Sequence, residues 1–505
     1  MADLADLKIA VWQREVRDDS SRQSRQAELD AVARAEALGA DCLVAHPLDR
    51  DRKSCIIPCN GAHAEGDTHR IDLRTSKSAF SIGLEGNSEG CDFTVRLQSE
   101  PWTLNSRFDS KEIDGIPSLA VGYVGMRNAG HAVRCYDGGS AAHDSFGNLQ
   151  FRLRSDFEED FSLVTLADEG TIAPQCDKKL LCALVATIRR FDTQVLGGSS
   201  PWIIGLSGGL DSSIVATLLV RALGADRVLG YNMPTRHNTS ATKDNAARLA
   251  EALGISFATA PIQDIVNATA DVLEKAGYAP GKLAGLALEN AQARARGNML
   301  ATFASIEGGV IANNANFVEA ALGYCTLYGD SVGAFAPIAD LTKVELFDLA
   351  RDLNDLIGTT VIPENLLPTE TEDGYIWETM PSAELADGQR DPMKWFYHDW
   401  LVRKLKAEPE TGAADVLSAY SEDGLASCGM AKWVRFYGLN DPQAFISDLE
   451  WVLRSMHRAT FKRIQAAPAL LVTSIDTPWG DAEVQRAWEP DEQYEELKRQ
   501  ILQTR

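Results

Sequence analysis

Short apolar runs alternate with amphipathic stretches along much of this chain, and that pattern predicts an α/β fold. Near the start, the apolar residues 7–12 and 41–44 are typical of strands, and residues 22–38 between them have helical spacing. This order predicts a βαβ unit. Residues 50–78 are polar and predict irregular structure. Further strands are expected downstream, at residues 80–84, 93–97 and 118–124.

A second alternating region begins at residues 202–206, an apolar run long enough for one buried strand. A polar turn follows it, and residues 214–223 then have the composition of a buried helix. Continued alternation predicts a doubly wound parallel sheet that binds ligands at the carboxyl ends of its strands. Later strands and helices are expected at residues 228–234, 241–253, 255–260, 286–304 and 310–312. The pattern predicts two domains and an acidic C-terminal arm, at residues 1–170, 171–477 and 478–505.

Composition narrows the class of protein. The chain has 505 residues, of which 45% are hydrophobic and 24% are charged, as in globular proteins of several domains. Its formal net charge of −23 argues against a nucleic-acid partner, and no apolar run reaches the ~18 residues of a membrane span. The start of the chain lacks the character of a signal peptide, so we expect a cytoplasmic protein. The nine cysteines are scattered without zinc spacing, and we expect reduced thiols.

The polar turn SGGLDSS at residues 207–213 joins a predicted strand to a predicted helix. The first backbone N–H groups of a helix have no internal partner, so this junction is suited to bind phosphate. Gly208 and Gly209 allow the backbone to approach closely, and the serine hydroxyls can donate hydrogen bonds. Asp211 would repel a bare phosphate and therefore indicates a bridging Mg²⁺. A Walker A loop is excluded because G-K-[ST] is missing, and a serine-rich helix cap without a ligand is the alternative.

Polar side chains also gather after later strands. Residues 313–319, NNANFVE, follow the strand expected at 310–312 and predict a polar site at a strand-to-helix junction. Thr342 can cap the next helix and place Lys343 where it can reach a phosphate. Arg236 follows another predicted strand, where it either meets a ligand or is a solvated loop residue.

The motif SGGLDSS resembles the PP-loop of ATP pyrophosphatases, which cleave ATP to AMP and pyrophosphate. Together with YNMPTR, LENAQARARG, EAALGYCTLYGD, FAPIADLTK, MPSAELADGQRD and TFKR in that order, it makes residues 200–475 resemble NAD synthetases. The resemblance implies an adenine nucleotide α-hydrolase-like fold and a ligase that forms a carbon–nitrogen bond. It implies that ATP, Mg²⁺ and ammonia convert nicotinic acid adenine dinucleotide to NAD through an adenylated intermediate. It also implies a homo-oligomer.

The same resemblance assigns roles to individual residues. The ATP site that it implies consists of Gly205, Leu206, Ser207, Gly208, Gly209, Leu210, Asp211, Ser212, Ser213, Asn314 and Lys343. The substrate site that it implies consists of Asn290, Arg294, Glu319 and Lys462. Asp211 and Glu319 would bind Mg²⁺ and, with Lys343, would carry catalysis. Alternatively, the polar groups of the helix expected at 286–304 simply face solvent.

Two stretches qualify this interpretation. Residues 314–319 read NANFVE where that family commonly has TGNKSE, so that Phe317 and Val318 replace a lysine and a serine. This difference supports an alternative, in which another carboxylate is the substrate. Residues 381–391 resemble a flexible lid, or are an ordinary surface loop. A non-catalytic paralogue that binds nucleotide or acts as a scaffold is a further alternative, although the retained metal-binding carboxylates argue against it.

The first 160 residues resemble, more weakly, the nitrilase-type α/β sandwich that precedes some NAD synthetases and releases ammonia from glutamine. The resemblance rests on IAVWQ, EALGADCLVAHP, SIGLEGNSEGCDFTV, YDGGSAAHDSFGNLQFRL and FEEDF. That chemistry needs Glu, Lys and Cys, but Leu48 and Glu85 occupy the aligned Glu and Cys positions and no lysine has a matching context. We therefore expect an inactive amidase domain, with ammonia taken free or from a separate glutaminase. Cys91 or Cys55 as a replacement nucleophile is the alternative.

Overall fold

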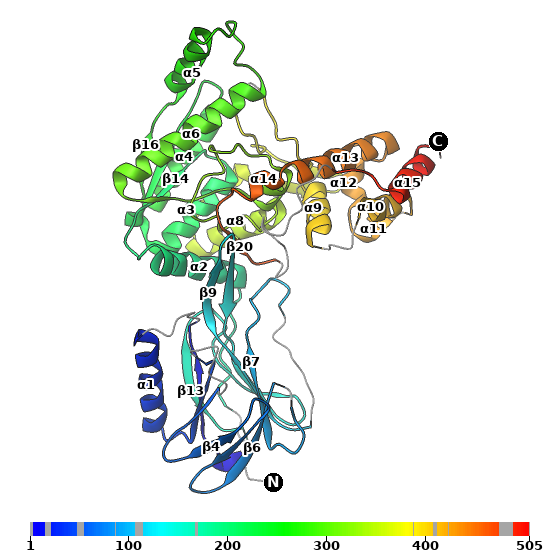
Figure 1. Cartoon of the computed structure of the whole chain (residues 1–505). Coiled ribbons are helices and arrows are strands. Elements are labelled where there is room, and N and C mark those ends of the chain that lie inside the picture. The colour runs from blue at the N-terminus through cyan, green and yellow to red at the C-terminus, as the bar shows by residue number, and fades with distance from the viewer. Residues whose placement is uncertain are drawn as a thin grey trace. The chain divides into compact units, whose positions relative to one another are not determined.

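The computed structural model describes residues 4–15, 22–47, 55–85, 87–106, 115–166, 170–386, 388–407, 412–422, 424–473 and 488–503 (Figure 1). The chain divides into two compact units. The first comprises Met1–Arg127 and Arg134–Arg190, and the second comprises Asn128–Val133 and Phe191–Arg505. The two units divide between Arg190 and Phe191, inside a helix, whereas the sequence predicts a boundary near Thr171. The predicted domain limits themselves stay a prediction.

The first unit begins with the expected βαβ arrangement. Strands β1 (Ile9–Gln13) and β2 (Cys42–Ala45) run parallel, with helix α1 (Arg22–Ala37) between them, so this prediction is confirmed. Strands β13 (Asp160–Val164) and β3 (Ile56–Pro58) pair antiparallel with them on either side. The result is a four-stranded sheet with the order β13-β1-β2-β3.

A seven-stranded sheet with the order β12-β11-β8-β7-β6-β5-β4 forms the rest of this unit's framework. Its strands are β4 (His63–Gly66), β5 (Arg70–Arg74), β6 (Ala79–Leu84), β7 (Phe93–Gln98), β8 (Ser118–Gly122), β11 (Ala141–His143) and β12 (Leu149–Arg152). The strands expected at residues 80–84, 93–97 and 118–124 are thus confirmed. The central strands β6, β7 and β8 run parallel, and the flanking pairs are antiparallel.

The prediction of irregular structure at residues 50–78 was wrong, because β3, β4 and β5 lie there. In β5 the side chains of Ile71 and Leu73 are buried, whereas the three charged residues that alternate with them are exposed. This is a strand pattern, but it is too short and too polar to stand out in the sequence. Pairing with β6 along the whole of β5 stabilises it.

Two hydrophobic clusters hold the sheets of this unit. One contains side chains of both sheets, such as Val11 and Val44 from the first and Val95 from the second. The other lies on the opposite face of the four-stranded sheet, where Ala35 of α1 packs in the same cluster as Leu43. Neighbouring residues of β2 therefore serve opposite faces, as the period of a strand requires. The expected α/β sandwich is confirmed.

A hairpin and a helix are each divided between the two units. Strands β9 (Val124–Ala129) and β10 (Ala132–Asp137) form the hairpin, and helix α2 (Lys179–Val195) follows β13. Arg190 of α2 pairs with Glu15 at 2.9 Å, which anchors the helix within the first unit. Two residues later, Asp192 accepts hydrogen bonds from Trp202 and Arg227 within the second unit.

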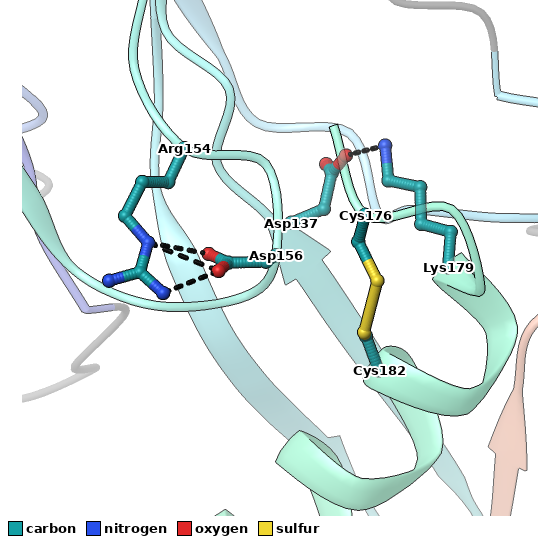
Figure 2. The surroundings of a disulfide bond; sticks show 6 residues. All are labelled: Asp137, Arg154, Asp156, Cys176, Lys179 and Cys182. Carbon is teal, nitrogen blue, oxygen red and sulfur yellow. Dashed lines mark hydrogen bonds and ion pairs between the residues drawn. A yellow bond between two sulfur atoms is a disulfide. The ribbon is translucent and has the colours of Figure 1, made fainter. Parts of the chain in front are cut away.

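A disulfide joins Cys176 and Cys182 at the start of α2 (Figure 2). This finding corrects the expectation that all cysteines are reduced, since a spacing of six residues carries no disulfide signal in the sequence. Beside the disulfide, the Lys179 ammonium lies 2.5 Å from a carboxylate oxygen of Asp137, and both side chains are largely buried. The remaining cysteines are free thiols: Cys42, Cys55, Cys59, Cys91, Cys135, Cys325 and Cys428.

The second unit contains a four-stranded parallel sheet with the order β16-β15-β14-β17. Its strands are β14 (Trp202–Gly205), β15 (Val228–Asn232), β16 (Ser256–Thr259) and β17 (Val310–Ile311). The connecting helices are α3 (Leu210–Leu223), α4 (Ser240–Leu253), α5 (Gln263–Lys275) and α6 (Leu286–Glu307). The strand order reverses at β14, because β15 and β17 lie on opposite sides of it, and such a reversal opens a crevice at the strand ends. The expected doubly wound sheet is confirmed.

The rest of the second unit is mainly helical. Its elements are α7 (Phe317–Leu322), α8 (Lys343–Ile357), β18 (Thr369–Thr371), β19 (Gly374–Ile376), α9 (Tyr397–Ala407), α10 (Ala413–Ser421), α11 (Gly424–Ser427), α12 (Ala431–Phe436), α13 (Pro442–Arg458), α14 (Thr460–Arg463), β20 (Ala469–Leu471) and α15 (Glu492–Gln503). Single 3₁₀ turns occur at Leu4–Asp6, Ala225–Arg227 and Glu364–Leu366. Helix α15 packs within the unit, because Tyr494 is fully buried and donates a hydrogen bond to Glu450 of α13 at 3.3 Å. Across the described residues, no helix combines the length and apolar character needed to cross a membrane.

Candidate active site

The glycine loop after β14 depends on the lack of a side chain at Gly208. This residue has a φ of +82°, and a Cβ placed on it would lie 1.8 Å from the carbonyl oxygen of Thr242 in α4. Gly209 is the N-cap of α3, which begins at Leu210. The helix thus starts four residues earlier than predicted, and Asp211 lies in its first turn. The motif itself therefore forms the start of α3, and a helix start of this kind is suited to bind an anion.

The serine hydroxyls of the loop divide into two groups. Ser207 and Ser212 lie side by side, with their Oγ atoms 3.2 Å apart, and both line the adjoining cavity. The Gly209 amide donates to Ser207 Oγ at 3.2 Å, which shapes the turn. The hydroxyls of Ser212 and Ser213 both donate to the carbonyl of Gly209, at 3.1 and 2.8 Å, but Ser213 is not among the residues that line the cavity. Ser207 and Ser212 are therefore the hydroxyls that can reach a bound phosphate.

Lys343 stands between two carboxylates at the end of this loop. Its Nζ atom lies 2.8 Å from both carboxylate oxygens of Asp211 and 3.6 Å from Oε1 of Glu319. The side chain of Lys343 is only 3% exposed. Asn316 fixes the arrangement, because its Nδ2 atom donates to Asp211 at 2.8 Å while its Oδ1 atom caps the helix that carries Glu319. The three residues predicted to carry catalysis thus lie together.

The start of α8 explains why Lys343 reaches this point. Thr342 and Glu345 form a reciprocal capping box, which confirms the predicted cap. The backbone N–H of Lys343 donates to Asp399 at 2.6 Å, and its ammonium lies 4.9 Å from the ring centroid of Trp395. A capped helix end and an aromatic face therefore hold the lysine against the carboxylates.

Burial and mutual charge set the protonation of the cluster. Burial raises the pKa of Glu319 above its usual range, although Lys343 opposes the change. Burial alone would lower the pKa of Lys343, but Asp211 and Glu319 reverse this effect and keep the ammonium charged. Burial also raises the pKa of Asp391, a third carboxylate near the lysine, to about 6. The cluster is anionic around one fixed cation.

The donor set fits a magnesium ion that is shared with a phosphate ligand. Mg²⁺ is commonly bound by one or two carboxylates and completes its shell with water and phosphate oxygens. Asp211 and Glu319 supply such carboxylates, and Lys343 shows that a cation is stable between them. Within the described ranges, no group of three or more Asp, Glu, His or Cys side chains forms a metal site made of protein ligands alone. The chemistry therefore suits a metal carried in with a nucleotide.

A cavity of about 320 Å³ lies over the loop and the charged cluster. It opens at the carboxyl ends of β14, β15 and β17, where the strand order reverses. Ten residues of the predicted site line it: Gly205, Leu206, Ser207, Gly209, Leu210, Asp211, Ser212, Asn314, Glu319 and Lys343. Gly208 and Ser213 lie outside its lining.

Asn314 carries an acceptor that has no partner among the residues that the structure describes. Its Nδ2 atom donates to the carbonyl of Gly205 at 3.0 Å, which ties it to the end of β14. Its Oδ1 atom is buried and lacks a hydrogen bond, although the residue lines the cavity. A buried unsatisfied acceptor is costly unless a ligand supplies a donor. The position of Asn314 therefore supports contact with a bound molecule.

The structure does not bring the other predicted substrate residues to the cavity lining. Arg294 lies on the exposed face of α6. Asn290 accepts a hydrogen bond from Thr326 at 2.7 Å. The ammonium of Lys462 donates to two backbone carbonyls of residues 323–325 and so supports the wall of the cavity rather than its surface. Their assignment to the substrate stays a prediction.

Sequence reasoning missed several residues that line the cavity. Arg296, two positions after Arg294, faces it and donates to the carbonyl of Met233 at 3.1 Å. The alanine-rich α6 has polar groups on both faces, so its period could not decide between the two arginines. Glu384 and Asp391 come from the segment interpreted as a lid or a surface loop, and both line the cavity. The sequence pattern identified the segment as a lid or a surface loop, but it did not assign either carboxylate to the site, because their contacts are tertiary.

The first unit lacks an obvious nucleophile at the position aligned with an amidase cysteine. Glu85 occupies it, at the end of β6, with a φ of 51° and its Oε1 atom accepting from the backbone N–H of Leu97 at 3.3 Å. Leu48, at the aligned Glu position, lies outside the described residues. Cys55 is buried, and burial raises the pKa of its thiol to about 12. Cys91 is half-buried, with its Sγ atom 3.6 Å from the carbonyl of Glu89.

Comparisons with known proteins identify relatives of both units. Residues 188–402 match the family described as NAD synthase. The glutamine-dependent NAD(+) synthetase of Synechocystis sp. is 32% identical over 412 residues, which cover 76% of this chain and 64% of that protein. The chain thus spans less than two thirds of the length of this relative.

Two solved structures resemble the whole chain in fold. One is a glutamine-dependent NAD+ synthetase from Acinetobacter baumannii in complex with ADP, with a TM-score of 0.61 and 20% identity over 96% of this chain and 100% of that chain. The other is a glutamine-dependent NAD(+) synthetase from Cytophaga hutchinsonii, with a TM-score of 0.67 and 14% identity over 98% of this chain and 100% of that chain. Both units therefore have the fold of such two-part enzymes.

Proposed function

We propose that this chain is a ligase that amidates nicotinic acid adenine dinucleotide to NAD, because residues 188–402 match the family described as NAD synthase. The observation that carries the proposal is the cluster of Asp211, Lys343 and Glu319 at the mouth of the glycine loop. It brings two carboxylates and a cation to the end of a helix that can bind phosphate, in a cavity at the switch point of the sheet. ATP supplies the driving force and becomes AMP and pyrophosphate.

In the proposed reaction, a carboxylate oxygen of the dinucleotide acid attacks the α-phosphorus of ATP. Pyrophosphate leaves, and the carboxylate becomes an acyl adenylate. Ammonia then attacks the carbonyl carbon, loses a proton and displaces AMP. Neither step needs a protein nucleophile, so the contribution of the chain is to hold the charges and exclude water.

The roles of the side chains follow from their positions. Ser207, Ser212 and the free N–H groups at the start of α3 bind the departing pyrophosphate. Asp211 and Glu319 would hold Mg²⁺, which would neutralise phosphate charge. Lys343 lies beside both carboxylates, where it would exchange its pairing with Asp211 for contact with the phosphate oxygens.

We propose that the nitrogen donor is ammonia, free or from a separate glutaminase. The support is chemical: Glu85 stands where the amidase alignment requires a cysteine, and burial raises the pKa of the alternative thiol, Cys55, to about 12. The relatives are named glutamine-dependent, so the first unit is the point at which this chain departs from them. A homo-oligomer and a cytoplasmic location belong to the same proposal.

A second candidate is an amide synthetase that acts on a different carboxylate. The replacements at residues 317 and 318 motivated it, and both Phe317 and Val318 are fully buried in α7. They pack in the core and are not among the residues that line the cavity. Neither side chain is therefore in a position to contact the substrate. The two replacements give no reason to assume another carboxylate, so the dinucleotide acid is the favoured substrate.

The test is the release of AMP and pyrophosphate from ATP and Mg²⁺ in the presence of nicotinic acid adenine dinucleotide. We expect turnover and NAD formation with ammonium chloride, and none with glutamine in ammonia-free buffer. Turnover with glutamine alone would contradict the inactive amidase. Absence of turnover with both donors would favour another carboxylate or a nucleotide-binding scaffold. The variant Asp211→Ala should lose pyrophosphate release in every condition.

A further inference from the structure

Glu384 belongs to the described stretch Thr379–Ala386, of which residues 379–385 line one side of the cavity, and four donors at the start of α4 converge on its carboxylate. Its Oε1 atom accepts from the backbone N–H and the hydroxyl of Thr239, at 3.4 and 3.0 Å. Its Oε2 atom accepts from Asn238 Nδ2 at 2.8 Å and from the hydroxyl of Thr242 at 2.9 Å. A carboxylate is stable at this helix end because the dipole favours negative charge there.

The same turn of α4 touches the glycine loop. The carbonyl of Thr242 occupies the space that a Cβ on Gly208 would need, so the two backbones are in direct contact. Thr242 thus meets Glu384 through its hydroxyl and Gly208 through its carbonyl oxygen. The side chain of Thr239 accepts from the backbone N–H of Thr242, which locks the first turn of the helix. The stretch that carries Glu384 and the glycine loop are distant in sequence, yet both pack against Thr242.

Helix α6 holds the same stretch at a second point. Gln292 of α6 is buried and donates to the carbonyl of Leu385 at 2.7 Å. Farther along, Gln389 donates to Glu289 of α6 at 3.4 Å. These contacts fix the position of the stretch against α6, whereas Glu384 is the residue that joins it to α4 and, through α4, to the glycine loop.

We propose that Glu384 is a positioning residue that couples the stretch Thr379–Ala386 to the glycine loop through Thr242. This inference rests on the proposed function, in which the glycine loop binds the phosphates of ATP. With Glu384 docked on α4, the stretch closes its side of the cavity and Gly208 is held in place. Docking of Glu384 and positioning of Gly208 both depend on Thr242. Closure of the stretch over the cavity therefore favours ATP binding, and ATP binding favours closure to the same extent.

The test compares wild type with Glu384→Ala and the conservative Glu384→Gln. Loss of the carboxylate leaves the closed state less populated, so the KM for ATP rises in proportion while kcat changes little. We expect about a tenfold rise in KM for Glu384→Ala, the change that corresponds to one charge-assisted hydrogen bond. Glu384→Gln keeps an amide oxygen as acceptor and should recover part of the loss. An unchanged KM in Glu384→Ala would overturn the inference.

A second measurement does not depend on the reaction. Arg390 follows the stretch Thr379–Ala386 in the sequence and is exposed. Trypsin can cleave after it, and the rate of cleavage reports on movement of the stretch away from the cavity. We expect faster cleavage after Arg390 in Glu384→Ala, and protection by Mg²⁺ with a non-hydrolysable ATP analogue in wild type only. Equal cleavage and equal protection in both proteins would overturn the coupling. Failure of the proposed function would instead appear as absent ligase activity with these proteolysis differences intact.

Glu289→Ala is the matched control. Glu289 accepts a hydrogen bond from the same segment, but it belongs to α6 and lies outside the link through Thr242. We expect its KM for ATP and its protection from trypsin by the analogue to equal those of wild type. A rise in KM as large as that of Glu384→Ala would show that any contact of the segment has this effect, and it would overturn the specific role of Glu384.

Discussion

The Nζ atom of Lys343 lies 2.8 Å from each carboxylate oxygen of Asp211, although 132 residues separate them in the chain. Lys343 is the first residue of α8, and Asp211 lies in the first turn of α3, so two helix starts meet at this point. The pairing keeps a cation at the place where phosphate charge is proposed to gather. A metal ion bound to Asp211 would have to compete with the lysine for the same carboxylate.

Lys343→Met should abolish pyrophosphate release and destabilise the second unit. Methionine has similar length but leaves Asp211 and Glu319 without their counter-ion, and breaking a buried ion pair typically costs about 3–5 kcal/mol. The measurements are pyrophosphate release and urea unfolding at pH 8. Lys432→Met is the control, because Lys432 pairs with the exposed Glu370 at 3.3 Å, and such pairs contribute about 1 kcal/mol or less. More than a tenth of wild-type turnover in Lys343→Met would contradict the role of the lysine.

Gly208→Ala should disable nucleotide binding, whereas Gly209→Ala should be mild. At Gly208 the φ of +82° and the carbonyl of Thr242, 1.8 Å from the Cβ position, force the loop or α4 to move. At Gly209 the nearest atom to a new Cβ is Ser207 Oγ at 3.3 Å, and the backbone conformation is extended. Calorimetry with ATP and Mg²⁺ should show no binding to the first variant and binding within about tenfold of wild type for the second. Equal affinities would contradict the loop geometry.

Asp391 should make the protein less stable as the pH rises from 5 to 7. Burial raises the pKa of this carboxyl from 3.8 to about 6, so the folded state binds the proton more tightly than the unfolded state. Its stabilising contribution is complete below pH 3.8 and is lost as the pH rises through 6. Asp391→Asn cannot titrate, and its free energy of unfolding should fall by about 1 kcal/mol less than that of wild type between pH 5 and 7. Parallel pH profiles would contradict the raised pKa.

The sequence predicted the floor of the candidate site better than its walls. Asp211, Glu319 and Lys343 were identifiable because each lies in a motif at a strand or helix end, where local chemistry and local structure coincide. Arg296 and Asp391 were missed because nothing local distinguishes a cavity-facing arginine on an alanine-rich helix, or a carboxylate in a polar segment. Their positions depend on tertiary packing between distant segments.

The elements of the fold also differ in how far the local sequence predicts them. Strands β1, β2 and β14 are short apolar runs that are buried on both faces, so their pattern in the sequence is strong. Strand β5 has only Ile71 and Leu73 directed to the core, and it depends on pairing with β6 for its existence. The bond between Cys176 and Cys182 likewise depends on the turn that leads into α2, which no spacing rule reveals.

Cys182→Ser should lower the stability of the first unit only in the absence of a reductant. The bond between Cys176 and Cys182 closes a short loop before α2, and a loop of this size is expected to contribute about 2 kcal/mol through the unfolded state. Without reductant, wild type should therefore have the larger free energy of unfolding and should leave two thiols unlabelled by iodoacetamide after denaturation. With dithiothreitol, wild type and variant should coincide. Cys428→Ser is the control, because Cys428 is exposed and free, and its stability should match that of wild type in both conditions. If Cys182→Ser is as stable as wild type without reductant, and all thiols react, the disulfide does not form.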